Sequence, residues 1–298
     1  MSEFGPSPAE EAEKEAAGVS LASEIAELRS HARTDEDFQV VLGKIKELKG
    51  LFGTESTESK VSVEEAKEIM GADFLGPEAI GKSSFGPEAV PTELPPILFS
   101  PEELEKAKEL GQFLILRSDQ IPGDKLELPN TKATLGKVPA KRWALVTKEF
   151  IPDSTSKNYL DQTEQLVKYL REEVFADKEI PPEYQEAIAE FEAQKEELRP
   201  LVISADAAVW EPAAERLASL RITSLARRSR DEALYDLEVY KQANDQYLLP
   251  TKYEWTSSRA SDGRLVSVGD FESGGVDVYG SGPGSVDPIL GVSFSRSQ

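Results

Sequence analysis

The sequence has no cysteine and only one histidine, His31, and these two shortages exclude several kinds of site. Without cysteine there are no disulfides, thiolate metal ligands or cysteine nucleophiles. A single histidine has no second histidine to form a metal pair, and no arrangement of Ser and carboxylate around it indicates a triad. Because histidine is the commonest general base, an enzyme of this sequence would depend on carboxylates, Lys, Tyr or Ser. Catalytic residues stay unknown, and neither a metal nor a cofactor is expected.

Basic residues and long apolar runs are also scarce. The chain holds 34 Lys and Arg against 55 Asp and Glu, a net charge of −21. Nucleic-acid affinity depends largely on Lys and Arg, so direct binding of DNA or RNA is not expected. No apolar run approaches the roughly 20 residues that span a bilayer, and the acidic start lacks the features of a signal peptide. We therefore expect a cytoplasmic protein that does not bind membranes; a protein partner is possible, and the oligomeric state is undetermined.

What remains is a globular composition, with 39% hydrophobic residues in a chain of 298. That length is enough for a sizeable core. The predicted fold class is α+β, with a helical N-terminal hairpin followed by a mostly antiparallel sheet that several helices cover and that ends in a β-meander. The predicted regions are a disordered acidic tail (1–17), a helical hairpin (18–53), a linker with a short helical segment (54–99) and an α+β domain (100–298).

The most informative stretch, residues 142–175, has the pattern of a strand, a polar elbow and an amphipathic helix. Apolar residues alternate from Trp143 onward in the manner of a mostly buried strand, which Pro152 should end. The short oxygen-bearing side chains that follow predict a helix start near residues 154–157. Apolar residues at three- and four-residue steps then give that helix one buried face.

The elbow has two interpretations. Its hydroxyls and free N–H groups can simply form the N-cap of the helix, or they can combine with its lysine and the positive helix end to bind an anion. Three C-terminal arginines are predicted to meet at one end of the sheet with Asp262 and Asp270, as ion pairs or as part of a polar site. The candidate anion-binding residues are Ser154, Thr155, Ser156, Lys157, Asn158, Arg259, Arg264 and Arg296.

A basic cluster lies ahead of another predicted helix. It consists of Arg221, Arg227, Arg228 and Arg230, and it precedes the capping-box pair Ser229 and Glu232. The cluster could bind an anionic partner or pair with the acidic helices of the same chain. The excess of carboxylates favours the second interpretation.

The last fifty residues change to alternating apolar patterns separated by Asp262-Gly263 and Gly274-Gly275, which are typical hairpin turns. They predict an antiparallel meander of four short strands. Together with the apolar run 113–117 and the strand at 142–150, this meander is expected to complete one sheet. The run GSGPGS at 280–285 is interpreted as a flexible turn, because it lacks the remainder of a phosphate-loop motif. A long helix beginning at Pro182 is expected to break at Pro200.

A resemblance covers residues 62–298. The run WALVTKEFIPDSTSKNYLDQTEQLVKYL, with EEAKEIMGADFLGPEAI before it and GRLVSVGDFESGGV and LGVSFSRS after it, resembles a family of uncharacterised bacterial proteins, largely from candidate phyla. That family has no established activity, so the resemblance implies no cofactor, partner or site residue.

Three hypotheses about function follow from the sequence. The first is a non-catalytic interaction or structural module, because no catalytic signature is present. The alternative is an anion- or nucleotide-binding enzyme that uses the elbow at 152–158. A carboxylate-based hydrolase is the third, and Asp and Glu are too numerous in this chain to point to particular residues.

Overall fold

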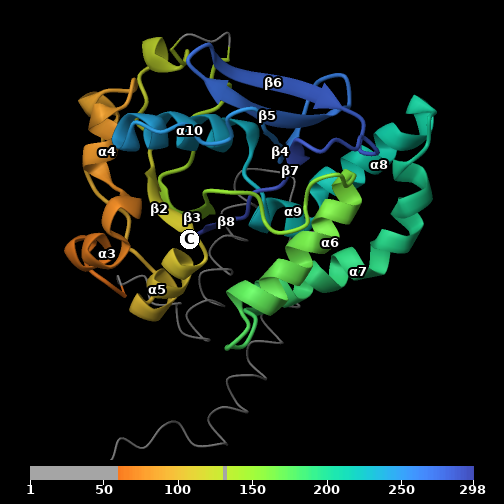
Figure 1. The fold of residues 1–298 in the computed structure, drawn as a ribbon, viewed down its shortest axis with the longest axis horizontal. Helices are drawn as coiled ribbons and strands as arrows, with labels where there is room; N and C mark the ends of the chain where they lie inside the picture. The colour runs from red at the N-terminus through yellow and green to blue at the C-terminus, as the bar shows by residue number, and fades with distance from the viewer. Residues whose placement is uncertain (1–59, 130–132) are drawn as a thin grey trace, which may run out of the picture. The chain divides into compact units, whose positions relative to one another are not determined.

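A computed structural model describes residues 60–129 and 133–298, which form an α+β unit with two four-stranded sheets (Figure 1). The α+β class is thus confirmed. The predicted acidic tail (1–17) and helical hairpin (18–53) lie outside the described residues. Residues 60–99 fall in the segment predicted as a linker with a short helical segment, and there Val61, Phe85 and Phe99 are buried in the same core as the first sheet.

The first sheet is built around a strand that is buried at every position. Strand β2 (Gln112–Arg117) contains the apolar run FLILR and lies between two neighbours, as a central strand should. The sheet order is β1-β2-β3-β8, with β1 (Phe74–Leu75) parallel to β2, and β3 (Arg142–Thr147) and β8 (Ser295–Ser297) each antiparallel to the strand before it. The register places Arg117 opposite Arg142 at one end of this sheet.

The second sheet contains the predicted meander. Its order is β6-β5-β4-β7, in which β4 (Tyr253–Arg259), β5 (Leu265–Glu272) and β6 (Gly275–Ser281) are antiparallel. The fourth strand, β7 (Leu290–Gly291), is parallel to β4 instead of continuing the meander. The prediction of a single sheet was also wrong, because β7 and β8 belong to different sheets. Residues 290–297 therefore connect the two sheets.

Helix α10 (Arg230–Asn244) explains why there are two sheets. Residues 232–240 are all buried, and a helix buried on every side needs a layer on each of its faces. It contacts β4 and β5 on one side and β2 on the other, where the Tyr235 hydroxyl donates to the Leu116 carbonyl at 3.0 Å. Figure 1 shows α10 between the sheets. Its predicted capping box is confirmed, since Ser229 and Glu232 each accept the other's backbone N–H.

The remaining helices cover the two sides of the first sheet. On one side lie α3 (Val63–Met70), α4 (Pro77–Lys82) and α5 (Pro101–Glu109); on the other lie α6 (Tyr159–Tyr169), α7 (Pro182–Val202) and α9 (Arg221–Ala226). Helix α8 (Ala207–Ser219) packs on α7 and α9 and contacts β4 of the second sheet. Short turns are η1 (Gly71–Asp73), η2 (Pro87–Ala89), η3 (Gly123–Lys125) and the π-helical turn η4 (Leu170–Val174).

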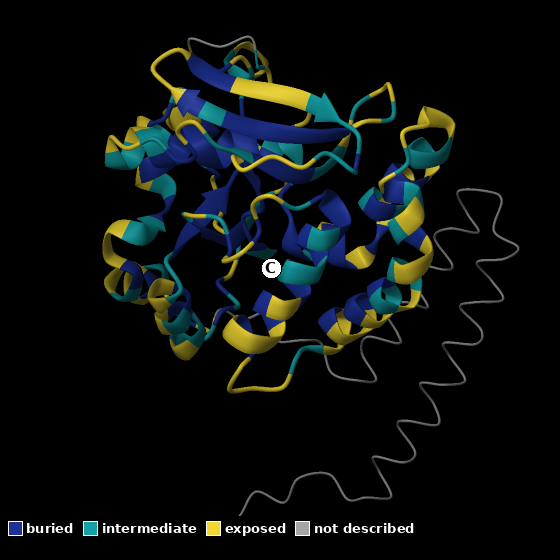
Figure 2. Cartoon of the chain, turned by 45° about the vertical axis from the view of Figure 1, so that its right-hand side comes forward, coloured by how far each residue is buried: buried dark blue, intermediate teal, exposed yellow. Residues whose placement is uncertain are grey.

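The predicted break at Pro200 does not occur. Helix α7 continues through Pro200 to Val202, and Pro200 is exposed in its last turn. Figure 2 shows buried residues concentrated on the strands and on α10, with exposed residues on the outer faces of the helices. Within the described ranges, no helix is long and apolar enough to cross a membrane.

Candidate functional site

A cavity of about 80 Å³ lies where the end of the first sheet meets α9 and α10. Its lining residues are mostly charged or bear hydroxyls: Arg117, Arg142, Ser224, Leu225, Arg227, Glu232, Ser295 and Ser297. A water molecule needs roughly 10–15 Å³ of such space, so the cavity has room for several waters or one small ion. We call it the arginine cavity.

Two opposed arginines form one wall of the arginine cavity. Arg117 on β2 and Arg142 on β3 are direct cross-strand neighbours, an arrangement in which like charges destabilise a sheet. Glu232, in the first turn of α10, offsets this repulsion because its Oε1 atom accepts from both guanidinium groups. The Arg117 Nη1–Glu232 Oε1 distance is 2.7 Å.

The ion pairs continue along α10 toward the second sheet. Asp236, one turn after Glu232, is fully buried and accepts two hydrogen bonds from Arg117, at 2.7 and 3.0 Å. Asp236 also accepts from Arg228, at 3.2 Å, and Arg228 reaches Glu254 on β4 at 2.6 Å. Helix α10 therefore joins charged residues of both sheets into one network.

Arg227 is the exception in this network, because its guanidinium has no carboxylate partner among the described residues. Only 3% of Arg227 is exposed. Its hydrogen bonds go to the carbonyls of Trp255 and Tyr159 and to the Thr163 hydroxyl, at 3.1–3.3 Å, and it stacks 4.0 Å above the Tyr159 ring. Burial lowers the pKa of Arg227, against the opposing effects of Tyr159 and Glu254.

The charges of the network and cavity do not balance. Four arginines face three carboxylates, which leaves one positive charge in excess: Arg117, Arg142, Arg227 and Arg228 against Glu232, Asp236 and Glu254. Arg142 is the exposed member of this set, with 36% of its side chain accessible, so water compensates part of the excess. Within the described part of the chain, the buried arginine without a carboxylate partner is Arg227, and burying such an ion costs several kcal/mol.

Hydrogen-bond donors are in excess as well. The Nε atoms of Arg142 and Arg227 are buried and have no acceptor. The hydroxyls of Ser295 and Ser297 accept from Arg117, at 3.3 and 3.2 Å, and their own protons meet no acceptor in the part of the chain described here. Unused donors beside an excess positive charge form a site suited to an oxyanion.

Glu232 is the one carboxylate in the lining, and it is a poor proton acceptor for catalysis. Burial favours its neutral form, but the charge of Arg117, the Ser229 N–H and Arg142 outweigh that effect and lower the pKa of Glu232 to about 2. A general base works best with a pKa near the operating pH. Glu232 is therefore unsuited to act as a general base near neutral pH.

At the elbow, the structure supports the capping interpretation, with a correction to its position. Helix α6 begins at Tyr159 and not within 154–157, and Asn158 is its N-cap, with its Oδ1 atom accepting from the Asp161 N–H at 3.0 Å. Ser154 does not cap the helix, because its buried hydroxyl oxygen accepts from the Val292 N–H at 3.3 Å. A distant segment of the chain thus uses the hydroxyl that local sequence assigned to the cap.

Backbone donors of the elbow are also used within the chain. The Ser156 N–H donates to the Asp287 carbonyl and the Tyr159 N–H to the Pro283 carbonyl, both at 3.0 Å. Thr155 is exposed and Lys157 is half-buried. An anion site at the elbow stays a prediction, since nothing in the structure tests it. The first residue of the helix that follows the elbow, Tyr159, stacks under Arg227, which lines the arginine cavity.

The three C-terminal arginines do not meet, contrary to prediction. Arg259 and Arg264 flank the β4–β5 hairpin, where Arg259 pairs with Glu215 at 3.5 Å and Arg264 with Asp262 at 3.7 Å. Arg296 lies on β8 in the other sheet. Asp270 instead accepts from the Tyr253 hydroxyl at 3.3 Å. The prediction failed because it assumed one sheet.

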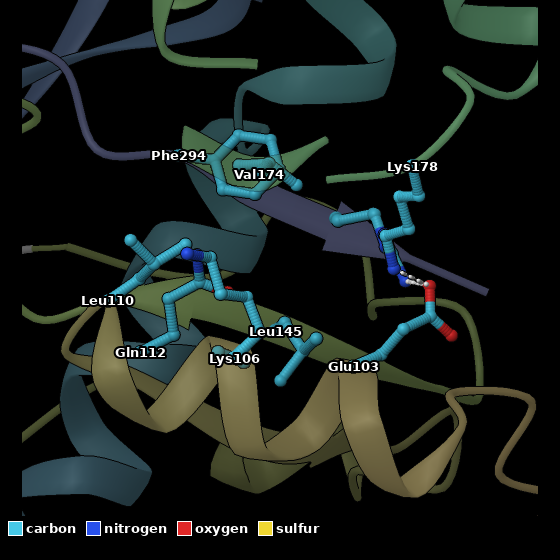
Figure 3. Close-up of a pocket in the computed structure, with 10 residues that line it drawn as sticks. Glu103, Lys106, Leu110, Gln112, Leu145, Val174, Lys178 and Phe294 are labelled. Atoms are coloured by element: carbon cyan, nitrogen blue, oxygen red, sulfur yellow. Dashed lines mark hydrogen bonds and ion pairs between the residues drawn. The ribbon is translucent and has the colours of Figure 1, made fainter. Parts of the chain in front are cut away.

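Arg296 borders a smaller cavity of about 20 Å³ between α5 and β8. There Glu103 points from α5 toward Lys178 (Figure 3) and accepts from Arg296 at 2.6 Å and from Lys178 at 3.1 Å. Burial favours the neutral carboxyl, but Arg296, the Ser100 N–H and Lys178 outweigh it and lower the pKa of Glu103 to about 2. The charges here are paired, and the space fits no more than a water or two.

Most arginines of the basic cluster form ion pairs with carboxylates of the same chain, which is the interpretation that the sequence favoured. Arg221 contacts Glu186 at 2.5 Å, Arg230 contacts Asp231 at 2.5 Å, and Arg228 belongs to the buried network. Sequence patterns did not distinguish Arg227 from these neighbours, and they missed Arg117 and Arg142. One available signal was Arg117 itself, a charge placed at the end of the apolar run FLILR.

Comparison with known proteins gives no guide to the site. No protein-family model matches the sequence, and neither a curated protein nor a solved structure matches it. The resemblance to uncharacterised bacterial proteins therefore stays a prediction. Over the described residues, no three His, Asp or Glu side chains gather in a way that could hold a metal ion.

Proposed function

We propose that the protein is a non-catalytic binding protein whose ligand is a small oxyanion held in the arginine cavity. The observation that carries this proposal is the Arg227 guanidinium, buried beside the cavity with neutral partners only. An oxyanion there would supply the missing negative charge. It would also accept from the serine hydroxyls and the guanidinium groups that line the cavity.

The chemistry of the wall favours an oxyanion over other ligands. Guanidinium groups form short, charge-assisted hydrogen bonds with phosphate and carboxylate oxygens. Here three guanidinium groups reach the cavity from β2, β3 and the segment between α9 and α10. Ion pairs to Glu232 already hold Arg117 and Arg142, and hydrogen bonds to Trp255, Tyr159 and Thr163 hold Arg227, so little ordering would be needed on binding.

The volume of the arginine cavity favours a small ion over a nucleotide as the ligand. Pockets for drug-sized ligands measure roughly 300–1,000 Å³, whereas the arginine cavity measures about 80 Å³. Inorganic phosphate, sulfate or a short carboxylate fits such a space, and a base and ribose do not. The ligand we propose is therefore a free small anion.

Thermal unfolding with added anions tests this proposal. Sodium phosphate should raise the Tm of the wild type in a concentration-dependent way, because a ligand of the folded state adds about 2.7 kcal/mol at a hundred times its Kd. Arg227→Met should abolish the rise. Arg221→Met is the matched control, since Arg221 begins the short helix α9 that Arg227 follows, but it is exposed and pairs with Glu186. This variant should respond as the wild type does.

Two results of this experiment would contradict the proposal. A wild type whose Tm is unmoved by phosphate, sulfate and acetate would show that the cavity binds no such anion. An unchanged phosphate response in Arg227→Met would place binding elsewhere. Should Arg227→Met not fold, the double variant Ser295→Ala/Ser297→Ala removes two donors without touching the ion pairs, and it should weaken phosphate binding at least tenfold.

A further inference from the structure

The position of Glu232 in the arginine cavity bears on which oxyanion would fit. A carboxylate offers about four lone-pair sites on its two oxygens. Three are used, because Oε1 accepts from Arg117 and Arg142 while Oε2 accepts from the Ser229 N–H at 2.8 Å. One acceptor site of Glu232 is left, and Glu232 lines the cavity.

An anion entering the cavity therefore meets a wall of donors with one negative group in it. The donors come from the guanidinium groups of Arg142 and Arg227 and the hydroxyls of Ser295 and Ser297, which line the cavity. A fully ionised anion has no proton to share with Glu232, so one of its oxygens would be repelled by the Glu232 carboxylate. An anion that carries a proton could instead donate it as a hydrogen bond to Glu232.

We infer that the arginine cavity selects an oxyanion that keeps a proton at neutral pH, which makes inorganic phosphate its ligand and excludes sulfate. This inference rests on the proposed function and restricts its ligand from small oxyanions in general to those that carry a proton. The donors bind three of the phosphate oxygens, and the protonated fourth oxygen donates to Glu232. Glu232 cannot supply the missing proton itself, since Arg117 and Arg142 hold it ionised.

Ligand chemistry divides the possible anions into two groups. Inorganic phosphate and arsenate keep at least one proton at pH 8, whereas sulfate and selenate have none. A phosphate monoester loses its last proton with a pKa near 6 and is therefore also unprotonated at pH 8. The comparison thus separates free phosphate from a phosphoryl group carried on a larger molecule.

Titration calorimetry at pH 8 provides the test, with phosphate, arsenate, sulfate, selenate and methyl phosphate as probes. The wild type should bind phosphate and arsenate at least tenfold more tightly than the other three. Glu232→Gln should bring sulfate to within about threefold of phosphate, because the amide can donate to a fully ionised oxygen. Glu103→Gln is the matched control: Glu103 is also ion-paired, but it lies at the smaller cavity, and the variant should keep the wild-type preference.

Each result has a distinct meaning. Wild-type protein that binds sulfate as tightly as phosphate would overturn the selection by Glu232 and leave the proposed function standing. Wild-type protein that binds none of the five anions would overturn the proposed function itself. A Glu232→Gln variant that folds, by circular dichroism, yet still rejects sulfate would assign the preference to another group.

Discussion

The residue that most affects the buried charges is Asp236. It is fully buried and accepts from both Arg117 and Arg228, so one carboxylate partners two cations. Removing one member of a buried ion pair leaves its partner unpaired, which costs much more than the net value of the pair. The stability of the protein should therefore depend strongly on this single side chain.

Asp236→Asn should lower the free energy of unfolding by about 3–5 kcal/mol, because it leaves two buried guanidinium groups with less compensation. Denaturant titration followed by tryptophan fluorescence measures the change. Asp245→Asn is the control, since Asp245 follows the same helix but is exposed, and its effect should stay within about 0.5 kcal/mol. A loss below about 1 kcal/mol for Asp236→Asn would show that water or rearrangement compensates the arginines.

At the scale of single elements, the start of α6 tests how far local sequence determines a helix terminus. Ser154, Thr155 and Asn158 are all good N-cap residues, and only Asn158 takes that role. Ser154 is engaged by Val292, which lies 138 residues away in the sequence. The choice between these caps is therefore made by tertiary contacts.

Asn158→Ala should cost about 1 kcal/mol of stability, the usual value of an N-cap side chain. Thr155→Ala removes an exposed hydroxyl from the same elbow and should change stability by less than about 0.5 kcal/mol. Urea unfolding of both variants beside the wild type provides the measurement. Equal effects would mean that the Asn158 side chain does not act as the cap.

The same contrast explains which elements were predictable. Strand β2, the capping box of α10 and the β4–β5–β6 meander depend on residues close together in sequence, and they were predicted from short-range sequence patterns. The separation into two sheets goes with the burial of α10, which contacts β2 of one sheet and β4 and β5 of the other. Its buried carboxylates Glu232 and Asp236 made that burial hard to predict, because their shared partner Arg117 is 115 and 119 residues away in the sequence.

The candidate site was predictable only in fragments. The arginines near α9 stood out as the sole basic cluster, but spacing alone does not show which of them lacks a carboxylate. Arg117 and Glu232 are 115 residues apart, and Ser295 lies farther along the chain still. The cavity forms where strands and helices that are distant in the sequence pack together, and local sequence patterns do not predict such contacts.

At the scale of the whole molecule, stability at acid pH depends on two carboxylates that form ion pairs between elements distant in the sequence. Glu103 joins α5 to Arg296 on β8, and Glu232 joins α10 to Arg117 on β2. The pKa of each is lowered from 4.5 to about 2 in the folded protein. A lowered pKa means that the stabilisation is fully present above pH 4.5 and is lost as the pH falls toward 2.

The Tm of the wild type should therefore fall steeply between about pH 4.5 and pH 2. Glu103→Gln should show a lower Tm near neutral pH, where the ion pairs with Lys178 and Arg296 are missing, and a shallower decline over the same acid window. Calorimetric scans at half-unit pH intervals would measure both slopes. Parallel curves for the two proteins would show that Glu103 does not contribute to the acid transition.

Residues 290–297 pair with β4 through β7 and with β3 through β8, and they also carry Ser295 into the arginine cavity. The contact between Arg117 and Ser295 joins residues 178 apart in the sequence. Contacts of such long range form slowly, so we expect this one to form late in folding. An anion that needs both residues has no binding site until that contact has formed. Its binding energy would therefore slow the opening of the native state and leave the rate of folding unchanged.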